Sequence, residues 1–326
     1  MQPADRVRRF EAAERDAVQT AWKNRLPDAP TDLTVDRGGP AASSEGMMAV
    51  FVNVRATLAY DVLARTSFVF NVAATRTERQ RILREALTIE PDGAAYEESE
   101  AGPGENRLLR LDAAEGPLRL AYEAEIELTP LVDTTDRLAQ QAHERLPTAV
   151  LTYLNPSRYC PSDRLSRWAM REFGAAPQGA GRVQAICDWV NARLDYMPGT
   201  TDERTDAAEA LLQCAGVCRD YAHVGISFCR ALGIPARYVS GYAVDLEPPD
   251  FHGFFEAYLG DAWYLFDATK LAPPGGFVRI GVGRDAADCA FATIVGAANL
   301  TEMEVSAERR GGSDVPTDDA NAISTA

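Results

Sequence analysis

The sequence predicts an α+β protein in which an all-β, sandwich-like domain precedes a domain of helices followed by an antiparallel sheet. The first observation is an alternation of apolar and polar residues in 50–60, 68–72 and 118–128, which is the period of a half-buried strand. The second is a helical spacing of apolar residues after Pro156, which gives way to strand-like runs after Pro235. Short strands with Gly and Pro turns predict the sandwich, and helices that precede strands predict the α+β domain.

The second domain is expected to begin with two helices. Ser162 is expected to cap a helix over 163–173, because its hydroxyl can accept a hydrogen bond from the first turn. The next helix is predicted by apolar residues that recur on one face, namely Val183, Ile186, Val190 and Leu194.

Composition and pattern divide the chain into five segments. The tail is polar and rich in Gly, Ser and Asp, which is typical of disorder. Met47 and Met48 are alternative translation starts to Met1. The predicted segments are a flexible or helical leader (1–46), an N-terminal antiparallel β domain (47–130), a polar connector (131–150), the second domain (151–304) and a disordered tail (305–326).

Composition excludes several classes of protein. The 326 residues are enough for two domains that each bury a core. A net charge of −15 argues against a nucleic-acid partner. No apolar run reaches the ~20 residues that span a membrane, and the first residues lack the apolar core of a signal peptide. The six cysteines are therefore expected to be reduced thiols in a cytoplasmic protein.

The segment 216–270 carries the residue types that a thiol nucleophile needs. Cys218 follows Gly216 and opens an amphipathic run that Gly233 and Pro235 end, as helix C-terminal signals do. We therefore expect Cys218 in the first turn of a helix of about four turns. Unpaired N–H groups and the positive end of the helix dipole favour a thiolate there. The alternative is that Cys218 is a small buried hydrophobic residue.

A predicted hairpin brings His252 and Asp267 together. The strand that starts at His252 and the strand that leads to Asp267 are separated by Gly260-Asp261, which is a tight-turn signal. A two-residue or four-residue turn places His252 opposite Thr269, so that His252 and Asp267 share a face within hydrogen-bonding reach. A three-residue loop would put them on opposite faces.

His252 is also the expected base by elimination, since the chain has only three histidines. His223 follows Cys218 by five positions and points about 140° away from the thiol on one helix, so we interpret it as a packed or polar helix residue. His143 lies in a polar segment and is interpreted as solvated. A thiol, a base and a carboxylate that orients the base form the set required for acyl transfer.

These motifs resemble the transglutaminase-like superfamily, a branch of the papain-like cysteine enzymes, in its bacterial type with an N-terminal β domain. The resemblance covers 151–295 and implies that Cys218 is the nucleophile, His252 the general base and acid, and Asp267 the orienting carboxylate. The matching motifs are Gly216-Val217-Cys218-Arg219-Asp220, Leu232-Gly233-Ile234-Pro235-Ala236-Arg237, 252–259 and 263–269.

Two positions depart from the animal transglutaminases, which carry Gln before the cysteine and Trp after it. Val217 and Arg219 occupy these positions here, which weakens the case for protein crosslinking. The backbone N–H of Cys218 is an expected donor to an oxyanion. Tyr196 and Gln213 are the two candidates for a second donor.

No cofactor or metal is expected. No acidic cluster has the spacing of a calcium-binding EF-hand loop. Cys214 and Cys218 have a tolerable zinc-ligand spacing, but no second pair follows at a suitable distance. We interpret Asp220, in the first turn of the expected helix, as a structural carboxylate that holds a neighbouring loop.

The sequence thus predicts cysteine-dependent acyl transfer on amide or peptide bonds. The reaction is either hydrolysis, as in a cysteine protease or amidase, or transfer to an amine, as in a transglutaminase. A peptide or protein amide is the expected substrate, with no nucleic-acid or membrane partner. The alternative is a catalytically silent peptide-binding or scaffold module on the same fold. The intact set of Cys218, His252 and Asp267 favours the enzyme.

Overall fold

The computed structural model describes residues 49–91, 94–102, 106–312, 314–315 and 321–326. The predicted leader (1–46) and the alternative starts Met47 and Met48 lie outside these residues. Within the described part of the chain, no helix combines the length and the apolar character needed to cross a membrane.

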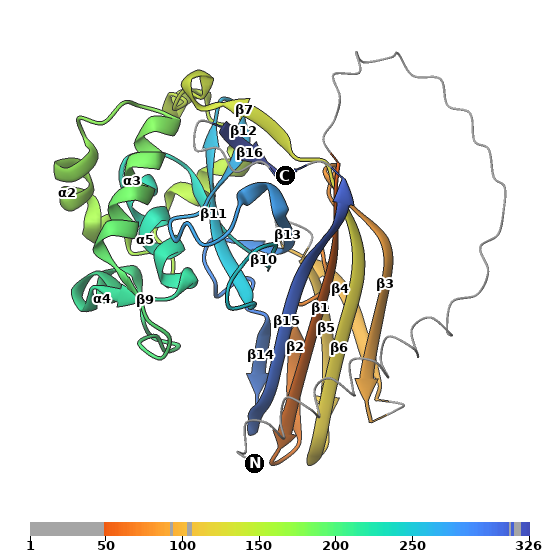
Figure 1. Cartoon of the computed structure of the whole chain (residues 1–326). Helices are drawn as coiled ribbons and strands as arrows, with labels where there is room; N and C mark the ends of the chain where they lie inside the picture. Colours follow the sequence, from red (N-terminus) through yellow and green to blue (C-terminus); the bar gives the residue numbers. More distant parts are fainter. Residues whose placement is uncertain (1–48, 92–93, 103–105, 313, 316–320) are drawn as a thin grey trace, which may run out of the picture. The chain divides into compact units, whose positions relative to one another are not determined.

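An antiparallel β-sandwich is formed by two sheets that face each other (Figure 1). The predicted strands 50–60 and 118–128 are confirmed in it, and the predicted strand 68–72 is found shifted toward the N-terminus, at Thr66–Phe70. The first sheet has the order β15 (Ala298–Gly312), β1 (Val50–Val62), β6 (Gly116–Leu128) and β3 (Gln80–Glu90). The second has the order β14 (Ala292–Val295), β2 (Thr66–Phe70), β5 (Asn106–Ala113) and β4 (Tyr96–Ala101).

The alternation of apolar residues explains why these strands form a two-layered core. Successive side chains of a strand point to opposite faces, and every second residue of β1, from Val50 to Tyr60, is buried. The inward face of β1 packs against the second sheet, where Tyr60 contacts the stacked rings of Phe68 and Phe70. The same core continues into the second domain through buried residues that include Tyr242 and Ile280.

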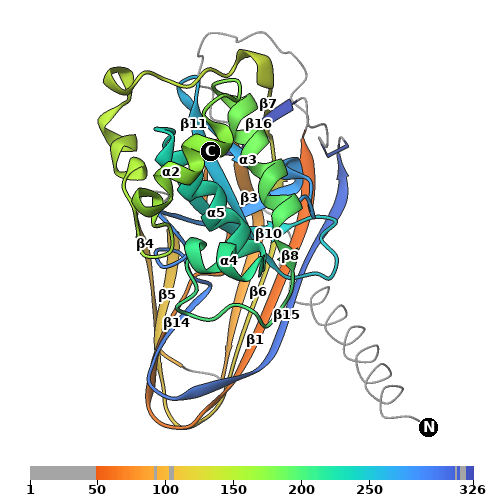
Figure 2. The same ribbon diagram turned by 90° about the vertical axis from the view of Figure 1, so that its left-hand side faces the viewer.

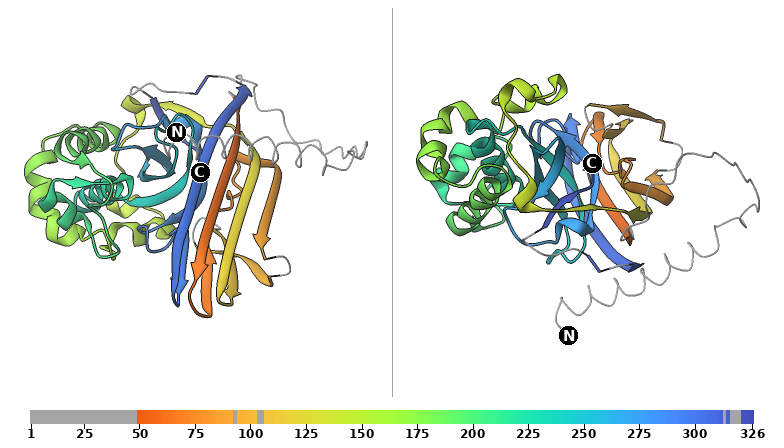
Figure 3. Two further views of the ribbon diagram at one scale, coloured as in Figure 1. Left: turned by 60° about the horizontal axis from the view of Figure 1, so that its bottom comes forward. Right: turned by 90° about the horizontal axis from the view of Figure 1, so that it is seen from above.

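The second domain combines helices with an antiparallel sheet, as the sequence predicts. The helices lie on one side of this sheet and the β-sandwich on the other (Figures 2 and 3). The sheet has the order β13 (Phe277–Gly283), β10 (Ala236–Ala243), β11 (Phe251–Leu259), β12 (Ala262–Phe266), β16 (Asn321–Ser324) and β7 (Leu131–Thr134). The helices are α2 (Ser162–Phe173), α3 (Ala180–Arg193), α4 (Ala207–Gln213) and α5 (Cys218–Ala231).

Shorter elements connect these parts. A parallel pair of two-residue strands, β8 (Asp195–Tyr196) and β9 (Ala215–Gly216), lies just before α5. The predicted connector 131–150 contains β7 and short 3-10 turns. The 3-10 helices are η1 (Thr135–Arg137), η2 (His143–Arg145), η3 (Thr148–Leu154) and η4 (Pro274–Gly276).

Two expectations about the helices have different outcomes. The predicted cap is wrong by one residue, because α2 already includes Ser162 and Pro161 occupies the cap position. The second stripe is confirmed in and just after α3, since its four residues are all buried, namely Val183, Ile186, Val190 and Leu194.

The predicted disorder of the tail (305–326) is wrong for residues 305–312 and 321–324, whereas 313 and 316–320 lie outside the described residues. Residues 305–312 continue β15, which pairs with β1 along its length. Residues 321–324 form β16, which lies between β12 and β7. Likewise, β14 pairs with β2, so the sandwich is completed by strands from the segment assigned to the second domain. Strand pairing gives the backbone N–H and C=O groups of these residues hydrogen-bond partners, which the polar composition of the segment does not reveal.

Two buried side-chain amides join the β-sandwich to the six-stranded sheet. The Gln80 side chain donates to the backbone oxygen of Arg279 over 2.9 Å and accepts from the Arg279 N–H over 2.7 Å. The Asn106 side chain makes the same pair of bonds with the backbone of Val282, at 2.9 and 2.8 Å. Each amide therefore satisfies backbone groups of β13 as a neighbouring strand would.

A buried ion cluster lies in the six-stranded sheet. The carboxylate of Glu256, on β11, is fully buried and lies 2.5 Å from both the Arg237 and the Arg279 guanidinium groups. Burial raises the pKa of Glu256, but the charges and hydrogen bonds of the two arginines outweigh it and lower the pKa to about 2. Arg237 also lies over the ring of Trp263, 4.1 Å from its centroid.

Replacing Glu256 with Gln should destabilise the fold by about 3–5 kcal/mol at pH 7, because it leaves two buried guanidinium groups without their counter-charge. The charge of Glu256 stabilises the fold above its unfolded-state pKa, and this contribution is lost as pH falls from about 4.5 to about 2. The difference between wild type and variant in urea unfolding should therefore shrink over that range. Glu123→Gln, which removes a partly exposed ion pair with Arg55, should cost at most about 1 kcal/mol. An equal cost for both variants would contradict this account.

Candidate active site

Cys218 is the first residue of α5, as the sequence predicts. The preceding residue, Val217, is extended and occupies the cap position, and the helix ends before Gly233, which has φ +76°. Gly225 allows α5 to approach β11 closely, since a Cβ there would lie 2.7 Å from the ring of Phe255. The packing of this helix on the sheet brings the Cys218 thiol to the side of β11 that carries the histidine.

The predicted hairpin register of β11 and β12 is confirmed. Leu259 pairs with Ala262 across a two-residue turn. The turn residues Gly260 and Asp261 have φ values of 54° and 73°, as a type I′ turn requires. The ladder continues to the last residue of β12, directly before Asp267.

His252 and Asp267 form a buried pair. The Nε2 atom of His252 lies 3.1 Å from Oδ2 of Asp267, and His252 is only 2% exposed. The second carboxylate oxygen, Oδ1, accepts hydrogen bonds from the backbone N–H of Thr269 over 2.8 Å and from its hydroxyl over 2.7 Å. Asn191 of α3 donates to the backbone oxygen of Thr269 over 2.9 Å, which holds the loop against the helix. The carboxylate is therefore oriented from both sides.

The surroundings favour the protonated imidazole. Burial lowers the pKa of His252, but the hydrogen bond to Asp267 and the negative charges of Cys218 and Asp267 outweigh it and raise the pKa to about 10. Nε2 is taken by Asp267, whereas Nδ1 is buried and makes no hydrogen bond of standard geometry within the described residues. Nδ1 is thus the nitrogen left for the thiol. The ring of Phe254 packs edge-on against the imidazole, 4.6 Å between centroids.

Of the two candidates for a second oxyanion donor, Tyr196 lies beside the thiol and Gln213 is bound elsewhere. β8 pairs with β9, which places Tyr196 opposite Gly216, and Tyr196 is 42% exposed. Burial and the negative charge of the nearby Cys218 raise the pKa of the Tyr196 hydroxyl. The amide of Gln213 instead donates to Glu209 on its own helix over 3.3 Å.

Asp220 has the structural role that the sequence suggested. Its fully buried carboxylate accepts hydrogen bonds from the Val217 N–H over 2.9 Å and from the Thr201 hydroxyl. Arg219 holds the same loop, since it donates to the backbone oxygen of Asp202 over 2.7 Å. Asp220 therefore ties the loop before α4 to the residue that precedes the nucleophile.

The other histidines lie outside this site. His223 is fully buried, stacks on Tyr159 and accepts a hydrogen bond from the Ala286 N–H over 3.2 Å at Nε2. Burial lowers the pKa of His223 well below its ordinary value, so that it is a packed, neutral helix residue. His143 is exposed in η2.

Cys218 is distinguished from the remaining cysteines by its exposure and position. Cys214 is also partly exposed, but its thiol faces the Leu211 carbonyl of the preceding helix α4, 3.5 Å away. Among the residues that the structure describes, no three His, Cys, Asp or Glu side chains gather as a metal site would require. The remaining four cysteines are buried, and burial raises the pKa of each thiol, namely Cys160, Cys187, Cys229 and Cys289.

Sequence reasoning did not assign a role to Thr269 or Asn191. The predicted register placed Thr269 opposite His252. This register was the feature of the sequence that could have indicated that Thr269 lies beside His252 and the Asp267 carboxylate. Asn191 has no local signal, because α3 lies more than seventy residues before Thr269 in the chain. Its contact depends on the packing of the helix against the loop after β12.

Two families match separate parts of the chain. Residues 168–268 match the transglutaminase-like superfamily, and residues 50–143 match the bacterial transglutaminase N-terminal domain. The first match ends one residue beyond Asp267 and contains Cys218 and His252. The second covers strands β1 to β7.

Similar proteins include one solved structure and several mycobacterial relatives. A protein from Cytophaga hutchinsonii, described as a proposed cysteine protease, is 40% identical, with 85% of this chain and 97% of that chain covered and a TM-score of 0.81. An uncharacterized protein from Mycobacterium leprae is 32% identical over 168 residues, which are 48% of this chain and 59% of the relative.

Uncharacterized proteins from Mycobacterium bovis and Mycobacterium tuberculosis are each 27% identical over 218 residues, which are 63% of this chain and 68% of each relative. The chain thus spans 59% to 68% of the length of these mycobacterial proteins. The likeness to the solved structure, in contrast, extends over nearly all of that chain and includes both the sandwich and the second domain. The chain belongs to the transglutaminase-like superfamily.

Proposed function

We propose that the chain is a thiol enzyme that cleaves amide bonds by acyl transfer, with Cys218 as nucleophile, His252 as general base and acid, and Asp267 as the orienting carboxylate. The observation that carries this proposal is the buried His252–Asp267 pair, with 3.1 Å between Nε2 and Oδ2, beside a cysteine at the start of a helix. A protonated imidazole and the positive end of a helix dipole both stabilise a thiolate.

In the first half of the reaction, the Cys218 thiolate attacks the carbonyl carbon of an amide. A C–S bond forms and the carbonyl oxygen becomes an oxyanion, for which the backbone N–H of Cys218 and the Tyr196 hydroxyl are the proposed donors. When the C–N bond breaks, His252 gives its proton to the leaving amine. The products of this half are a free amine and a thioester on Cys218.

In the second half, His252 removes a proton from the acyl acceptor. Water as acceptor releases a carboxylic acid, and an amine as acceptor releases a new amide. In either case the C–S bond breaks, and the thiolate and imidazolium are restored. Asp267 keeps Nε2 of His252 occupied and leaves Nδ1 for the proton transfers, in keeping with its orienting role.

Hydrolysis is the form of the reaction that we propose. Animal transglutaminases carry Trp at the position of Arg219, and here the guanidinium of Arg219 donates to the loop carbonyl of Asp202 and lies over the Tyr159 ring, 5.1 Å from its centroid. Arg219 is thus engaged in contacts within the chain. We therefore propose no amine-binding surface at this position, and water is the proposed acyl acceptor. A peptide or protein amide is the proposed substrate.

The test is capture of the acyl-enzyme. The wild-type protein is mixed with a library of peptide aminocoumarin amides, quenched in acid and analysed by intact-mass spectrometry. We expect a mass increase equal to one acyl group, located on Cys218 and removed by hydroxylamine, as a thioester requires. Adding methylamine before the quench divides the products between acid and amide, and the acid should predominate. Coumarin release without any acyl adduct on Cys218 at any quench time, with unchanged release by Cys218→Ala, would refute covalent catalysis.

A further inference from the structure

A pocket lies in the β-sandwich and shares no residue with the proposed acyl-transfer site. Its volume is about 140 Å3, and it lies between β3 and β4, the edge strands of the two facing sheets. The interior is lined by apolar side chains that include Phe70, Val72 and Leu109. Charged and aromatic side chains, including Tyr96 and Glu98, line its other side.

The size of the pocket limits what it can hold. An apolar protein cavity of about 150 Å3 accommodates one benzene molecule. The 140 Å3 between the two sheets therefore fits an apolar group of about that size. Burial of such a group against Ala73 and Leu87 would be favourable, because both side chains are apolar and keep part of their surface exposed at the pocket.

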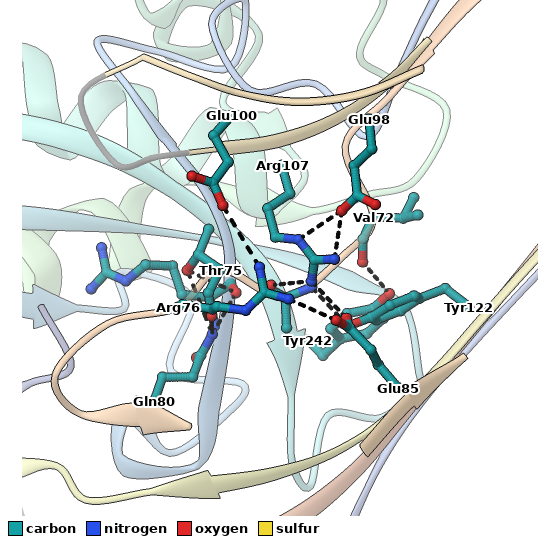
Figure 4. A network of polar contacts seen from close by, with 12 residues as sticks. Val72, Thr75, Arg76, Gln80, Glu85, Glu98, Glu100, Arg107, Tyr122 and Tyr242 are labelled. Carbon is teal, nitrogen blue, oxygen red and sulfur yellow. Dashed lines mark hydrogen bonds and ion pairs between the residues drawn. The ribbon is translucent and has the colours of Figure 1, made fainter. Parts of the chain in front are cut away.

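The charged side of the pocket is built around Arg107, whose side chain is only 7% exposed. Its guanidinium donates to Glu98 over 2.6 and 3.0 Å, to Glu85 over 2.6 Å and to the backbone oxygen of Ala74 over 3.1 Å (Figure 4). Four of the five N–H groups of the guanidinium are thereby used. Arg107 is therefore a poor partner for an anionic ligand.

The carboxylates, in contrast, have capacity left. Glu98 uses only Oε1 for Arg107, and its side chain is 44% exposed, so that Oε2 is available to a ligand. Arg76 pairs with Glu85 at 2.8 Å and with Glu100 at 3.6 Å. Two guanidinium groups thus face three carboxylates, which leaves one negative charge in excess. The pocket is suited to a cation.

Tyr96 provides a second reason to expect a cation. It lies on β4 two residues before Glu98, so both side chains point to the same side of the strand. Tyr96 is 50% exposed although its ring lines an apolar pocket. An exposed aromatic ring beside a carboxylate can attract an ammonium group through its π face.

We propose that this pocket binds a small organic cation that consists of a primary ammonium group on an apolar body no larger than about a benzene ring. The apolar body lies against Ala73 and Leu87. The ammonium group lies at Oε2 of Glu98 and the ring of Tyr96. The site is separate from the acyl-transfer machinery and does not depend on that proposal.

The experiment is isothermal titration of the full chain with benzylammonium chloride, benzyl alcohol and sodium benzoate at pH 7. We expect saturable binding of one benzylammonium per chain, at least tenfold tighter than benzyl alcohol, and no binding of benzoate. Glu98→Gln keeps an oxygen for Arg107 but removes the charge, and should weaken benzylammonium binding at least tenfold. Ala73→Leu, which places bulk in the pocket wall, should abolish it.

The matched control is Glu97→Gln. Glu97 is the neighbouring residue on β4, points to the other face and pairs only loosely with Arg110, at 3.6 Å. This variant should bind benzylammonium as wild type does, and thermal unfolding should show that all three variants are folded. The proposal is overturned if wild type shows no saturable binding, if benzoate binds more tightly than benzylammonium, or if folded Glu98→Gln binds like wild type.

Discussion

Replacing Cys218 with alanine is expected to abolish amide cleavage while leaving the fold intact. The thiol supplies the nucleophile, so turnover should fall by at least about a thousandfold. The side chain is small and lies at the start of α5, so the free energy of unfolding should fall by only about 1 kcal/mol. Turnover of a fluorogenic peptide amide and a urea unfolding curve measure the two effects.

Cys214→Ala is the matched control for this prediction. Cys214 is the other partly exposed cysteine, lies four residues earlier and directs its thiol to the Leu211 carbonyl. Its variant should keep wild-type turnover. Full turnover in Cys218→Ala would contradict the assignment, and loss of turnover in Cys214→Ala alone would move the nucleophile to that residue.

The second large effect is expected for Asp267→Asn. Asparagine retains the shape but favours the wrong tautomer of His252, which should lower turnover by about 10² to 10⁴-fold. Loss of the negative charge should also bring the pKa of His252 down from about 10. A less stable imidazolium stabilises the thiolate less, so the pH profile of Cys218 alkylation should move to higher pH.

Asp261→Asn provides the control on the same hairpin. Asp261 lies in the turn with φ 73°, a conformation that asparagine tolerates. This variant should leave both turnover and the alkylation profile unchanged. If Asp267→Asn behaves in the same way, Asp267 is only a structural carboxylate at the end of β12, and its 3.1 Å contact with His252 has no catalytic use.

The spatial arrangement of the candidate triad was largely predictable from local sequence. Gly260-Asp261 specifies a two-residue turn, and the turn sets the register that brings His252 and Asp267 to one face. The helix that starts at Cys218 is likewise marked by its own end signals, Gly233 and Pro235. What the local pattern does not contain is the burial of His252, which depends on how α5 and the loop after β12 pack over it.

The C-terminal strands were not predictable in the same way. β15 has most of its side chains exposed because it is the edge strand of its sheet, so it lacks the apolar alternation that identified β1. Its partner lies more than two hundred residues earlier, and the two are joined mainly by the backbone ladder. The roles of Gln80 and Asn106 at β13 depend on the same kind of distant contact.

A cytoplasmic location stays a prediction.

The most direct test of the central claim is the rate at which iodoacetamide alkylates Cys218 at pH 7, followed by peptide mass spectrometry. A thiol that is paired with the buried His252 imidazolium at the start of a helix should be labelled selectively and at least about tenfold faster than a free cysteine, because the thiolate is the reactive form. His252→Ala should remove this advantage. Labelling of wild-type Cys218 no faster than a free thiol would contradict the account and would indicate a catalytically silent module on the same fold.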